Sequence, residues 1–479
     1  MIDRSNITLI RGLGLVAAIS IVVGNVIGTG VFLKARVMTC NVGTPGRVMA
    51  VWVAAGLLSL AGALTYAELA AMMPRAGGEY VFIREAYGAP WGFLYGWMSF
   101  FIGKAGSQAA LAVGFAIFLN DLTGRALNAT YFTLDLRYFK VPFGALQVVA
   151  LAAIAIVTFI NCAAVRVSGH VAALLTGIKV ALVLAIGCGA FLFARGDWAH
   201  LGMTGVNGMC EGVDAASRVG MAGFSAAMLG ALWAYDGWNN VTLVAGEIKN
   251  PQRNIPLALI GGTITVGALY VFVNVAYFYV LTPAEIASVP KASSVAAEVA
   301  RQFLGPLAVS LIAAAMMTSS FGTLHTSVLT GARVPYAMSR DRLFFSSLSH
   351  ISPRTHVPTG ALLLQGLWSS VLALSGSFDA LTDYAIFGLW IFYGLTTASV
   401  FVFRRRMPEA DRPYRTWGYP VVPVLFLLAT LWLLGTTLWA TPVQAFVGLI
   451  LIALGLPVYF YWARINRVAY LETSSTDED

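Results

Sequence analysis

Two short segments decide the fold of this chain of 479 residues: GNVIGTGVF at residues 24–32 and WAYDGWNN at residues 233–240. Each lies within a long apolar run, where a continuous helix would favour Leu or Ala over glycine. The first contains three glycines within seven residues, and the second contains an acidic residue beside a glycine. Both segments are therefore expected to interrupt a helix. At membrane depth, such irregular backbone is tolerated only where it lines a cavity or is buried in protein, because its N–H and C=O groups need partners.

The composition places both segments in a membrane. Hydrophobic residues make up 58% of the chain and charged residues only 11%, less than half of the charged share of about 25% that is usual in soluble proteins. A spanning helix needs roughly 20 apolar residues, so twelve helices would use about half of the chain and leave no room for a large soluble domain. The apolar runs are continuous, without the alternation of a porin-like β-barrel. The expected class is an all-α membrane protein.

Hydropathy predicts twelve membrane-spanning helices, the first of which is expected to be retained because no signal-peptide cleavage site follows it. Their approximate ranges are 12–36, 48–72, 90–120, 144–165, 169–194, 221–246, 256–281, 305–334, 359–377, 383–403, 420–440 and 443–463. The interruptions fall in spans one and six. A five-helix unit that is repeated once enters the membrane from the opposite side, so this spacing predicts a five-plus-five inverted repeat.

The repeat divides a single polytopic domain that covers residues 1–479. The first repeat is expected over 1–194, the second over 220–404, two further helices over 405–465, and a cytoplasmic tail over 466–479.

The net charge of +8 is interpreted as a topology signal and not as a nucleic-acid site. If the N-terminus is cytoplasmic, the alternating segments on that side carry 18 of the 30 Lys and Arg residues, the opposite segments carry 10, and Lys104 and Lys179 lie within spans. Basic residues gather on the cytoplasmic side of membrane proteins. Both termini are therefore expected to be cytoplasmic, in a multi-pass protein of the cell membrane (plasma or inner) that contacts the lipid bilayer and no nucleic acid.

The interrupted helices would present opposite partial charges to a ligand. A carboxylate suits the positive dipole end of a half-helix, which the amides of Gly28, Thr29 and Gly30 provide. An ammonium group suits exposed carbonyls, which are expected near Val26, Trp233 and Asp236. A ligand that carries both groups at the spacing of an amino acid would satisfy both ends. The alternative is that the glycines only allow close helix packing, as small residues do in many membrane bundles.

Several segments carry a family resemblance when they are taken together. They are GNVIGTGVF (24–32), TPG (44–46), GALTYAEL (62–69), GGEY (77–80) with YG (87–88), SQA (107–109), AYDGWN (234–239) and GEIKNPQRNIP (246–256). With them the chain resembles the amino acid-polyamine-organocation (APC) superfamily, most closely the L-type amino acid transporter family and its bacterial relatives. The resemblance extends to about residue 415.

The resemblance implies the LeuT-like inverted-repeat fold, with helices 1 and 6 unwound at mid-membrane, and transport by alternating access. It implies that the amides of residues 28–30 bind the substrate carboxylate and that the carbonyls of Val26, Trp233 and Asp236 bind its amine. It also implies that Trp233 forms an aromatic gate over the substrate. For Trp233, ordinary packing in the helix bundle is the alternative.

Lys179 is a lone cation in the middle of span five. A charge at the membrane centre costs at least about 2.5–3.5 kcal/mol, so this ammonium is expected to face the interior and find oxygen partners. The resemblance implies that it replaces a bound sodium ion between spans one and eight. Contacts are therefore expected with backbone near Val23 and Gly24 and with hydroxyls such as Ser319 or Ser320. A proton-coupled variant, in which Lys179 loses its charge during the cycle, stays open.

Asp236 resembles the residue found in relatives that accept cationic as well as neutral amino acids. Its carboxylate could pair with a cationic substrate, or it could cap the second half-helix. Lys104 lies where many family members carry an arginine in span three, and its charge would oppose a cationic substrate. Asn25, Lys104 and Asn239 are the candidates for a side-chain pocket.

Other polar residues indicate structure more than chemistry. Glu68, Glu79 and Arg84 are interpreted as gate or loop ion pairs, and His325 as a satisfied interior histidine. No catalytic triad, metalloprotease or phosphate-loop motif occurs in the sequence, so we expect neither an enzyme nor a cofactor. The four cysteines lack metal-ligand spacing, so we expect neither a metal site nor a disulfide framework; they are Cys40, Cys162, Cys188 and Cys210.

One departure from the family concerns partners. Animal members are linked to a single-span glycoprotein through a cysteine in the external loop after span three, whereas the corresponding loop here, about 121–142, has no cysteine. A disulfide-linked heavy chain is therefore not expected, and a stand-alone, bacterial carrier is. The expected function is sodium-independent exchange of neutral L-amino acids, with cationic ones left open. A proton- or sodium-coupled symporter or a polyamine carrier of the same fold is the alternative, and a non-transporting amino acid sensor is the least favoured.

Overall fold

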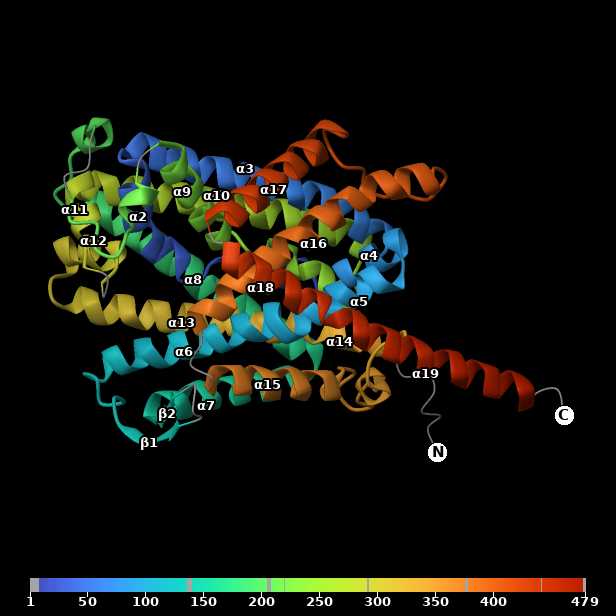
Figure 1. Ribbon diagram of the computed structural model, residues 1–479. Helices are drawn as coiled ribbons and strands as arrows, with labels where there is room; N and C mark the ends of the chain where they lie inside the picture. Colours follow the sequence, from blue (N-terminus) through green and yellow to red (C-terminus); the bar gives the residue numbers. More distant parts are fainter. Residues whose placement is uncertain are drawn as a thin grey trace.

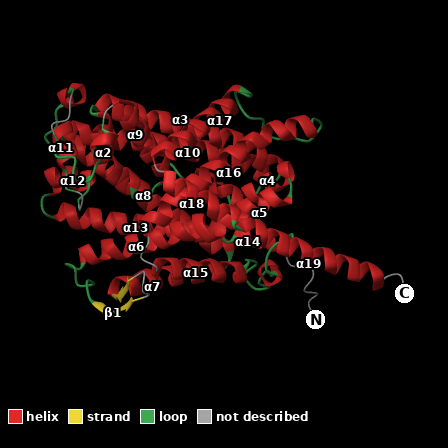
Figure 2. Ribbon diagram, in the orientation of Figure 1, coloured by secondary structure: helices red, strands yellow, loops and turns green. Residues whose placement is uncertain are grey.

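The chain is almost entirely helical in the computed structural model, which describes residues 8–135, 140–204, 208–218, 220–290, 293–374, 378–440 and 442–476. Figure 2 shows one small hairpin among the helices, in which β1 (Thr130–Asp135) pairs antiparallel with β2 (Lys140–Gly144).

The main elements follow the expected division of the chain. Those of the first repeat are α1 (Leu15–Val26), α2 (Gly30–Val42), α3 (Pro45–Met72), α4 (Glu79–Tyr87), α5 (Ala89–Met98), the π-helical segment η2 (Ser99–Lys104), α6 (Ala105–Leu122), α7 (Ala145–Cys162) and α8 (Val165–Phe193). Those of the second are α9 (Gly220–Ala234), the 3₁₀ segment η5 (Trp238–Glu247), α10 (Pro251–Val280), α11 (Pro283–Ser288), α12 (Val295–Leu304), α13 (Leu307–Gly331), α14 (Arg333–Arg340), α15 (Thr359–Leu374) and α16 (Phe378–Arg406). They are followed by α17 (Val421–Ala440), α18 (Pro442–Ala453) and α19 (Gly455–Thr476).

Among the described residues, nine helical stretches are long and apolar enough to cross a membrane, and the bent pair of α1 and α2 makes up to ten. Two expected spans fall outside this set for a physical reason. The span formed by α9 and η5 is interrupted, and α15 has only 16 residues. The all-helical membrane class is confirmed, and the count of twelve stays a prediction.

The interrupted first span lies inside the bundle, where α1 packs against α8, α10 and α13. Eight of the 12 residues of α1 are buried. Figure 1 shows α3 running beside α10 and α6 beside α13, so that helices far apart in the chain enclose the centre together. The first break is therefore surrounded by helices of both halves of the chain.

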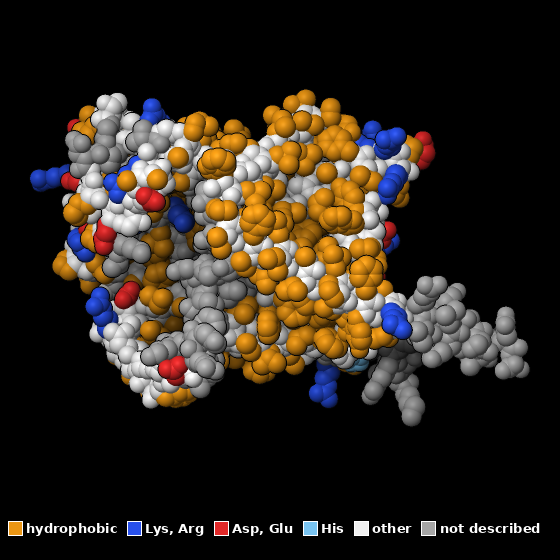
Figure 3. Space-filling view, in the orientation of Figure 1, with side chains coloured by type: hydrophobic (Ala, Val, Ile, Leu, Met, Phe, Trp, Pro, Cys, Tyr) orange, Lys and Arg blue, Asp and Glu red, His pale blue; other side chains and the backbone are white. Residues whose placement is uncertain are grey.

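The two ends of the molecule differ. In Figure 1, α11, α12 and the β-hairpin lie at one end, whereas α4, α14 and α19 lie at the other. We call these the hairpin end and the α4 end. Figure 3 shows hydrophobic side chains over most of the visible face between them, with charged side chains gathered mainly toward both ends. This is the surface expected of a protein whose middle faces lipid.

A disulfide bond joins Cys40 of α2 to Cys210 in the segment before α9. The expectation that no disulfide forms is therefore wrong. The two cysteines are 170 residues apart, so their spacing in the sequence carries no sign of pairing and only the fold brings them together. The same segment also receives a hydrogen bond from Arg36 of α2, whose Nη1 donates to the Glu211 carbonyl at 2.6 Å. Cys162 and Cys188 are free thiols.

Candidate functional site

The first break separates α1 from α2. α1 ends at Val26, α2 begins at Gly30, and the two helices are bent by 40°. A Cβ atom on Gly30 would lie 2.7 Å from the Cβ of Ala234, so only glycine lets α2 approach α9 this closely. The first amides of a helix have no carbonyl partner within it, so the α2 turn that starts at Gly30 directs N–H groups into the break. Such a helix start suits an anionic group.

The second break separates α9 from η5. α9 ends at Ala234, and the Asp236 amide donates to the Trp233 carbonyl at 3.1 Å. Gly237 has a φ of +99°, which is a left-handed conformation that residues with a side chain rarely adopt. Gly237 and not Asp236 occupies the N-cap position of η5. The capping role considered for Asp236 is therefore taken by its neighbour, and the Asp236 carboxylate instead accepts a hydrogen bond from the Tyr393 hydroxyl at 2.7 Å.

The two breaks meet in one place. A Cβ on Gly237 would lie 3.0 Å from the Cβ of Asn25, which itself donates to the Ile21 carbonyl within α1. The hydroxyl of Tyr270, from α10, lies 2.9 Å from the Val26 carbonyl and 3.0 Å from the Ala234 carbonyl. Tyr270 thus bridges the ends of α1 and α9.

Some residues of both breaks keep accessible surface although their neighbours are buried. The buried ones include Val26 and Ile27 on one side and Ala234 and Tyr235 on the other. The partly accessible ones are Gly28, Thr29, Trp233 and Asp236. The predicted substrate residues other than Val26 and Gly30 therefore share an accessible surface where the two breaks meet.

Several of the main-chain groups expected to bind substrate already have partners. The Val26 carbonyl accepts from the Gly28 amide at 2.8 Å as well as from Tyr270. The Trp233 carbonyl accepts from the Asp236 amide. In this conformation an ammonium group would share or replace these bonds. The amide end of α2 is the more available half of the expected site.

Lys179 is 1% exposed and donates three hydrogen bonds. Its Nζ lies 2.7 Å from the Gly24 carbonyl, 2.9 Å from the Ile27 carbonyl and 2.6 Å from the Thr323 hydroxyl. An ammonium has three donors, so its hydrogen-bonding capacity is filled. The expected contact with Gly24 is present, and Lys179 of α8 joins the end of α1 to α13.

The hydroxyl that contacts Lys179 differs from the expected ones. Ser319 donates to the Ile27 carbonyl at 3.0 Å, beside Lys179. The Ser320 hydroxyl is buried and has no hydrogen-bond partner in the described part of the chain. Thr323 follows Ser319 by one helical turn and so lies on the same face of α13. That spacing was the signal in the sequence that could have identified it.

A buried polar network adjoins the second break. Lys104, at the end of the π-helical segment η2, donates to the Asn240 side chain, and the Asn239 side chain donates to Glu79 of α4. Asn239 also lies 3.5 Å from the Tyr393 hydroxyl that holds Asp236. π-helical segments often occur at functional sites. The pocket candidates Lys104 and Asn239 are therefore connected to Asp236 through neutral side chains.

The sequence did not identify Glu79, Asn240 or Tyr393 as neighbours of the site. Glu79 was expected in a loop ion pair, but its oxygens accept hydrogen bonds from Asn239 and, at 3.4 Å, from Thr242. Burial raises the pKa of the Glu79 carboxyl, although the charge of Lys104 acts in the opposite direction. Glu79 thus belongs to the network around the second break.

The break is closed at the α4 end. The Leu13 amide donates to the Glu247 carbonyl at 2.9 Å, and the Lys249 amide donates to the Leu13 carbonyl at 2.8 Å. The Glu247 carboxylate forms a fully buried ion pair with Arg333, at 2.7 Å. These contacts tie the start of α1 to the end of η5 and to α14.

Other structural expectations are confirmed. Glu68 pairs with Arg404 at 2.7 Å. His325 is buried, and its ring nitrogens lie 3.2 Å from the Asn161 amide and 3.0 Å from the Ser168 carbonyl. Arg84 pairs with Asp341 of the segment after α14 and with Glu85. Within the described ranges, no three His, Cys, Asp or Glu residues gather closely enough to hold a metal ion.

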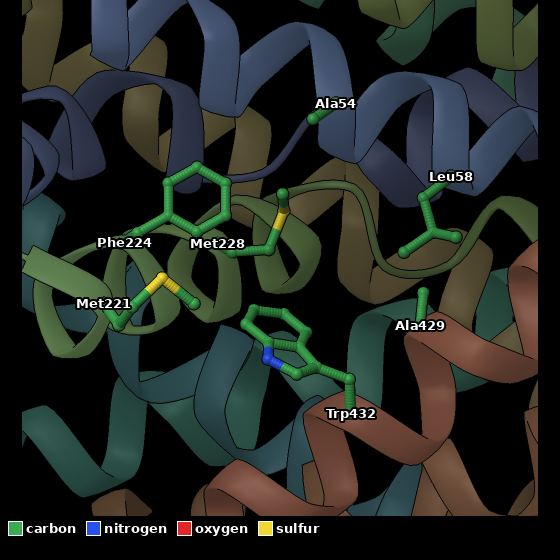
Figure 4. Close-up of a pocket in the computed structure, with 7 residues that line it drawn as sticks. All are labelled: Ala54, Leu58, Met221, Phe224, Met228, Ala429 and Trp432. Atoms are coloured by element: carbon green, nitrogen blue, oxygen red, sulfur yellow. The ribbon is translucent and has the colours of Figure 1, made fainter.

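A separate pocket of about 400 Å³ lies between α3, α9 and α17 (Figure 4). Its lining residues are hydrophobic: Ala54, Leu58, Met221, Phe224, Met228, Ala429 and Trp432. It includes none of the residues at the two breaks and offers no charged group to an amino acid. We therefore do not assign it as the substrate site.

The comparison with protein families is decisive. Residues 13–460 match the family described as amino acid permease. The chain belongs to this family. The permease is 31% identical to the serine/threonine exchanger SteT of Bacillus subtilis (strain 168), in a match that covers 94% of this chain and 96% of that protein. It is also 31% identical to the human b(0,+)-type amino acid transporter 1, with coverages of 94% and 87%.

A further relative of the permease is the human large neutral amino acids transporter small subunit 2, which is 30% identical over 95% of this chain and 82% of its own length. The permease is thus a multi-pass membrane protein of the APC superfamily that acts in amino acid transport. Its family and these relatives are transporters and not enzymes.

Proposed function

We propose that this permease exchanges small L-amino acids across the cell membrane by alternating access, without sodium. The observation that carries the proposal is the position of Lys179. Its ammonium is held by the Gly24 and Ile27 carbonyls and the Thr323 hydroxyl, between α1, α8 and α13. A sodium ion would also use carbonyl and hydroxyl oxygens as ligands. A fixed ammonium among these oxygens supplies the same charge, so no bound sodium is needed to hold the broken helix.

The substrate main chain is proposed to bind where the two breaks meet. The amide end of α2, from Thr29 to Gly30, takes the carboxylate because it has a positive partial charge and lies beside accessible surface. Carbonyls of Val26, Trp233 and Asp236 take the amine, which replaces the internal hydrogen bonds that they form here. Recognition through main-chain groups fits a ligand class defined by its amino and carboxyl groups.

Asp236 and the network around it are proposed to read the substrate side chain. The carboxylate is partly accessible and its hydrogen bond to Tyr393 leaves room for a further donor. Lys104 is held by Asn240, so its charge is directed away from direct pairing with Asp236. Neutral amino acids are the primary substrates of the proposal, and cationic ones are the extension that Asp236 supports. Asn25 and Asn239 complete the proposed pocket.

The two breaks also support the proposed twelve-helix, five-plus-five inverted repeat. In it, α1 with α2 and α9 with η5 are the unwound first helices of two repeats, 1–194 and 220–404. The helices of 405–465 follow, and 466–479 forms the tail.

The proposed orientation places the hairpin end outside the cell and both termini in the cytoplasm. The Cys40–Cys210 disulfide supports it, because disulfides persist in oxidising compartments. The excess of Lys and Arg in the other set of segments supports it independently. Since Cys40 and Cys210 are bonded to each other and loop 121–142 has no cysteine, we propose that the permease works without a disulfide-linked heavy chain.

The test uses purified permease in liposomes. Vesicles are preloaded with unlabelled L-serine, L-leucine or L-arginine, or left empty, and the entry of each labelled amino acid is measured. Exchange requires that label enters only vesicles that contain a substrate, and the three amino acids separate neutral from cationic selectivity. Protein-free vesicles are the control. Uptake into empty vesicles that is driven by a sodium or proton gradient alone would replace exchange by coupled symport.

A further inference from the structure

One cation on the outer half of the broken helix has no part in the proposed function so far. Lys34 of α2 is partly buried, and its Nζ lies 4.8 Å from the centre of the Trp233 ring on α9. Its Cδ lies 3.8 Å from the position that a Cβ on Gly230 would occupy. The lysine stem therefore crosses α9 at Gly230 and places the ammonium over the indole.

The Trp233 ring lies between this cation and the proposed carboxylate site. Its Cζ3 atom lies 3.4 Å from the position of a Cβ on Gly30. The ring therefore touches the first turn of α2, while Lys34 lies one turn further along the same helix. A cation within about 6 Å of the centre of an aromatic ring is attracted to it, most strongly when the ring is that of tryptophan.

The direction of the side chain argues against simple snorkelling. A lysine that sought water would extend its ammonium toward the nearer end of the span, here the end of α2 at Val42. The ammonium of Lys34 instead lies over Trp233, whose neighbour Ala234 packs against Gly30 at the break. Its position is thus set by the indole.

The helices on either side of this contact are held together by other means. The disulfide between Cys40 and Cys210 and the hydrogen bond from Arg36 to Glu211 tie α2 to the segment before α9. The close approach of Gly30 to Ala234 joins the helices at the break. With α2 and α9 held at both levels, the indole can leave the site by rotation of its own side chain. The cation above it opposes that rotation.

We propose that Lys34 is a positioning residue of the outer gate, whose ammonium holds the Trp233 indole across the outer side of the substrate site. The inference rests on the proposed function, in which Trp233 is the gate. When Lys34 loses its charge, the indole leaves the closed position more often and the bound amino acid escapes outward before it crosses. The external KM then rises, whereas kcat, which follows steps after closure, changes less.

The test compares Lys34→Met, which keeps the stem and removes the charge, with Lys34→Arg, which keeps a cation that stacks on indole. Exchange is measured with whichever of L-serine, L-leucine and L-arginine the wild type exchanges fastest, and binding of the same amino acid is measured on the purified protein. A cation–π contact of this kind predicts an external KM about three- to thirty-fold higher in Lys34→Met. Lys34→Arg should stay near wild type. Arg47→Met, which removes an exposed cation near the start of α3, is the control for surface charge.

The same change in a Trp233→Leu background shows whether Lys34 acts through the ring. There, Lys34→Met should have no additional effect on KM or binding. If it raises KM by the same factor as in the wild type, Lys34 acts elsewhere and the inference is wrong. If Lys34→Met alone leaves both quantities unchanged while Trp233→Leu alters them, the gate stands and the role of Lys34 falls. If Trp233→Leu itself exchanges like wild type, the gate fails and the inference fails with it. Trp233→Phe, in which the effect of Lys34→Met should shrink but persist, serves if the Leu variant does not fold.

Discussion

Substitution of Lys179 by methionine separates transport from folding. Methionine keeps most of the length of the stem and removes the ammonium, and with it the hydrogen bonds to the Gly24 and Ile27 carbonyls at 2.7 and 2.9 Å. Hydrogen bonds with a charged partner contribute about 1.5–3 kcal/mol each, so the two together hold the end of α1 with about 3–6 kcal/mol.

The lower end of that range is the better figure for exchange. The Ser319 and Thr323 hydroxyls also donate to the Ile27 carbonyl, at 3.0 and 3.3 Å, and they remain in the variant. A loss of about 3 kcal/mol corresponds to a rate or affinity about 100-fold lower. Folding should suffer far less, because the variant no longer buries a charge, a cost of at least about 2.5–3.5 kcal/mol at the membrane centre.

The assay is exchange in preloaded liposomes together with the thermal unfolding temperature of the same preparation. We expect Lys179→Met to lose about 100-fold in exchange while its unfolding temperature stays close to that of the wild type. Lys249→Met, which removes an exposed lysine at the α4 end, should leave both unchanged. Wild-type exchange by a folded Lys179→Met protein would refute the role of this ammonium. A collapse of folding and exchange together would assign Lys179 to stability.

Three other variants probe the remaining parts of the account. Asp236→Asn keeps the shape of the side chain and removes its charge, and we expect L-arginine exchange to fall about tenfold, the value of one charge-assisted contact, with L-leucine exchange nearly unchanged; equal losses would make Asp236 structural. Gly30→Ala should force α2 from α9 at a cost of about 1–3 kcal/mol and slow exchange of every substrate, whereas Gly46→Ala, where a Cβ meets nothing within 4 Å, should not; normal kinetics of Gly30→Ala would contradict the close approach. Cys40→Ser, or Cys210→Ser, should lower the unfolding temperature, because a disulfide contributes about 2–4 kcal/mol. After treatment of intact cells with a membrane-impermeant reductant, both thiols should react with an impermeant maleimide; labelling only from the cytoplasmic side would reverse the proposed topology.

The helix breaks could be predicted because their cause is local. Glycine-rich backbone within an apolar run weakens a helix wherever that run lies. The structure accordingly ends α1 at Val26 and α9 at Ala234, each within a segment selected from the sequence. Burial of Lys179 could be predicted for a similar reason, since the cost of a charge in lipid depends on its depth in a span.

What the sequence could not reveal depends on the rotation and pairing of distant helices. Ser319, Ser320 and Thr323 lie within about one turn of α13, and only the packing of that helix decides which hydroxyl meets Lys179. Tyr270 reaches both broken helices from α10, and nothing near it in the sequence marks it. The Cys40–Cys210 pair likewise exists only once the segment before α9 folds against α2.

The capping role of Asp236 was considered on sound local grounds, because Asp is a good N-cap residue. It was displaced by one position because the turn needs the left-handed conformation of Gly237, which then takes the cap. Asp236 is thereby left with its carboxylate toward Tyr393 and the accessible surface of the break. This single-residue offset changes Asp236 from a structural cap into a candidate for substrate recognition.

The central claim is that the ammonium of Lys179 makes a sodium ion unnecessary for the transport cycle. The most direct measurement is the initial rate of exchange in preloaded liposomes in sodium buffer, in choline buffer, and in choline buffer with a protonophore that abolishes any proton gradient. The account predicts the same rate in all three. A rate that rises with sodium, or one that falls when the proton gradient is abolished, would contradict it.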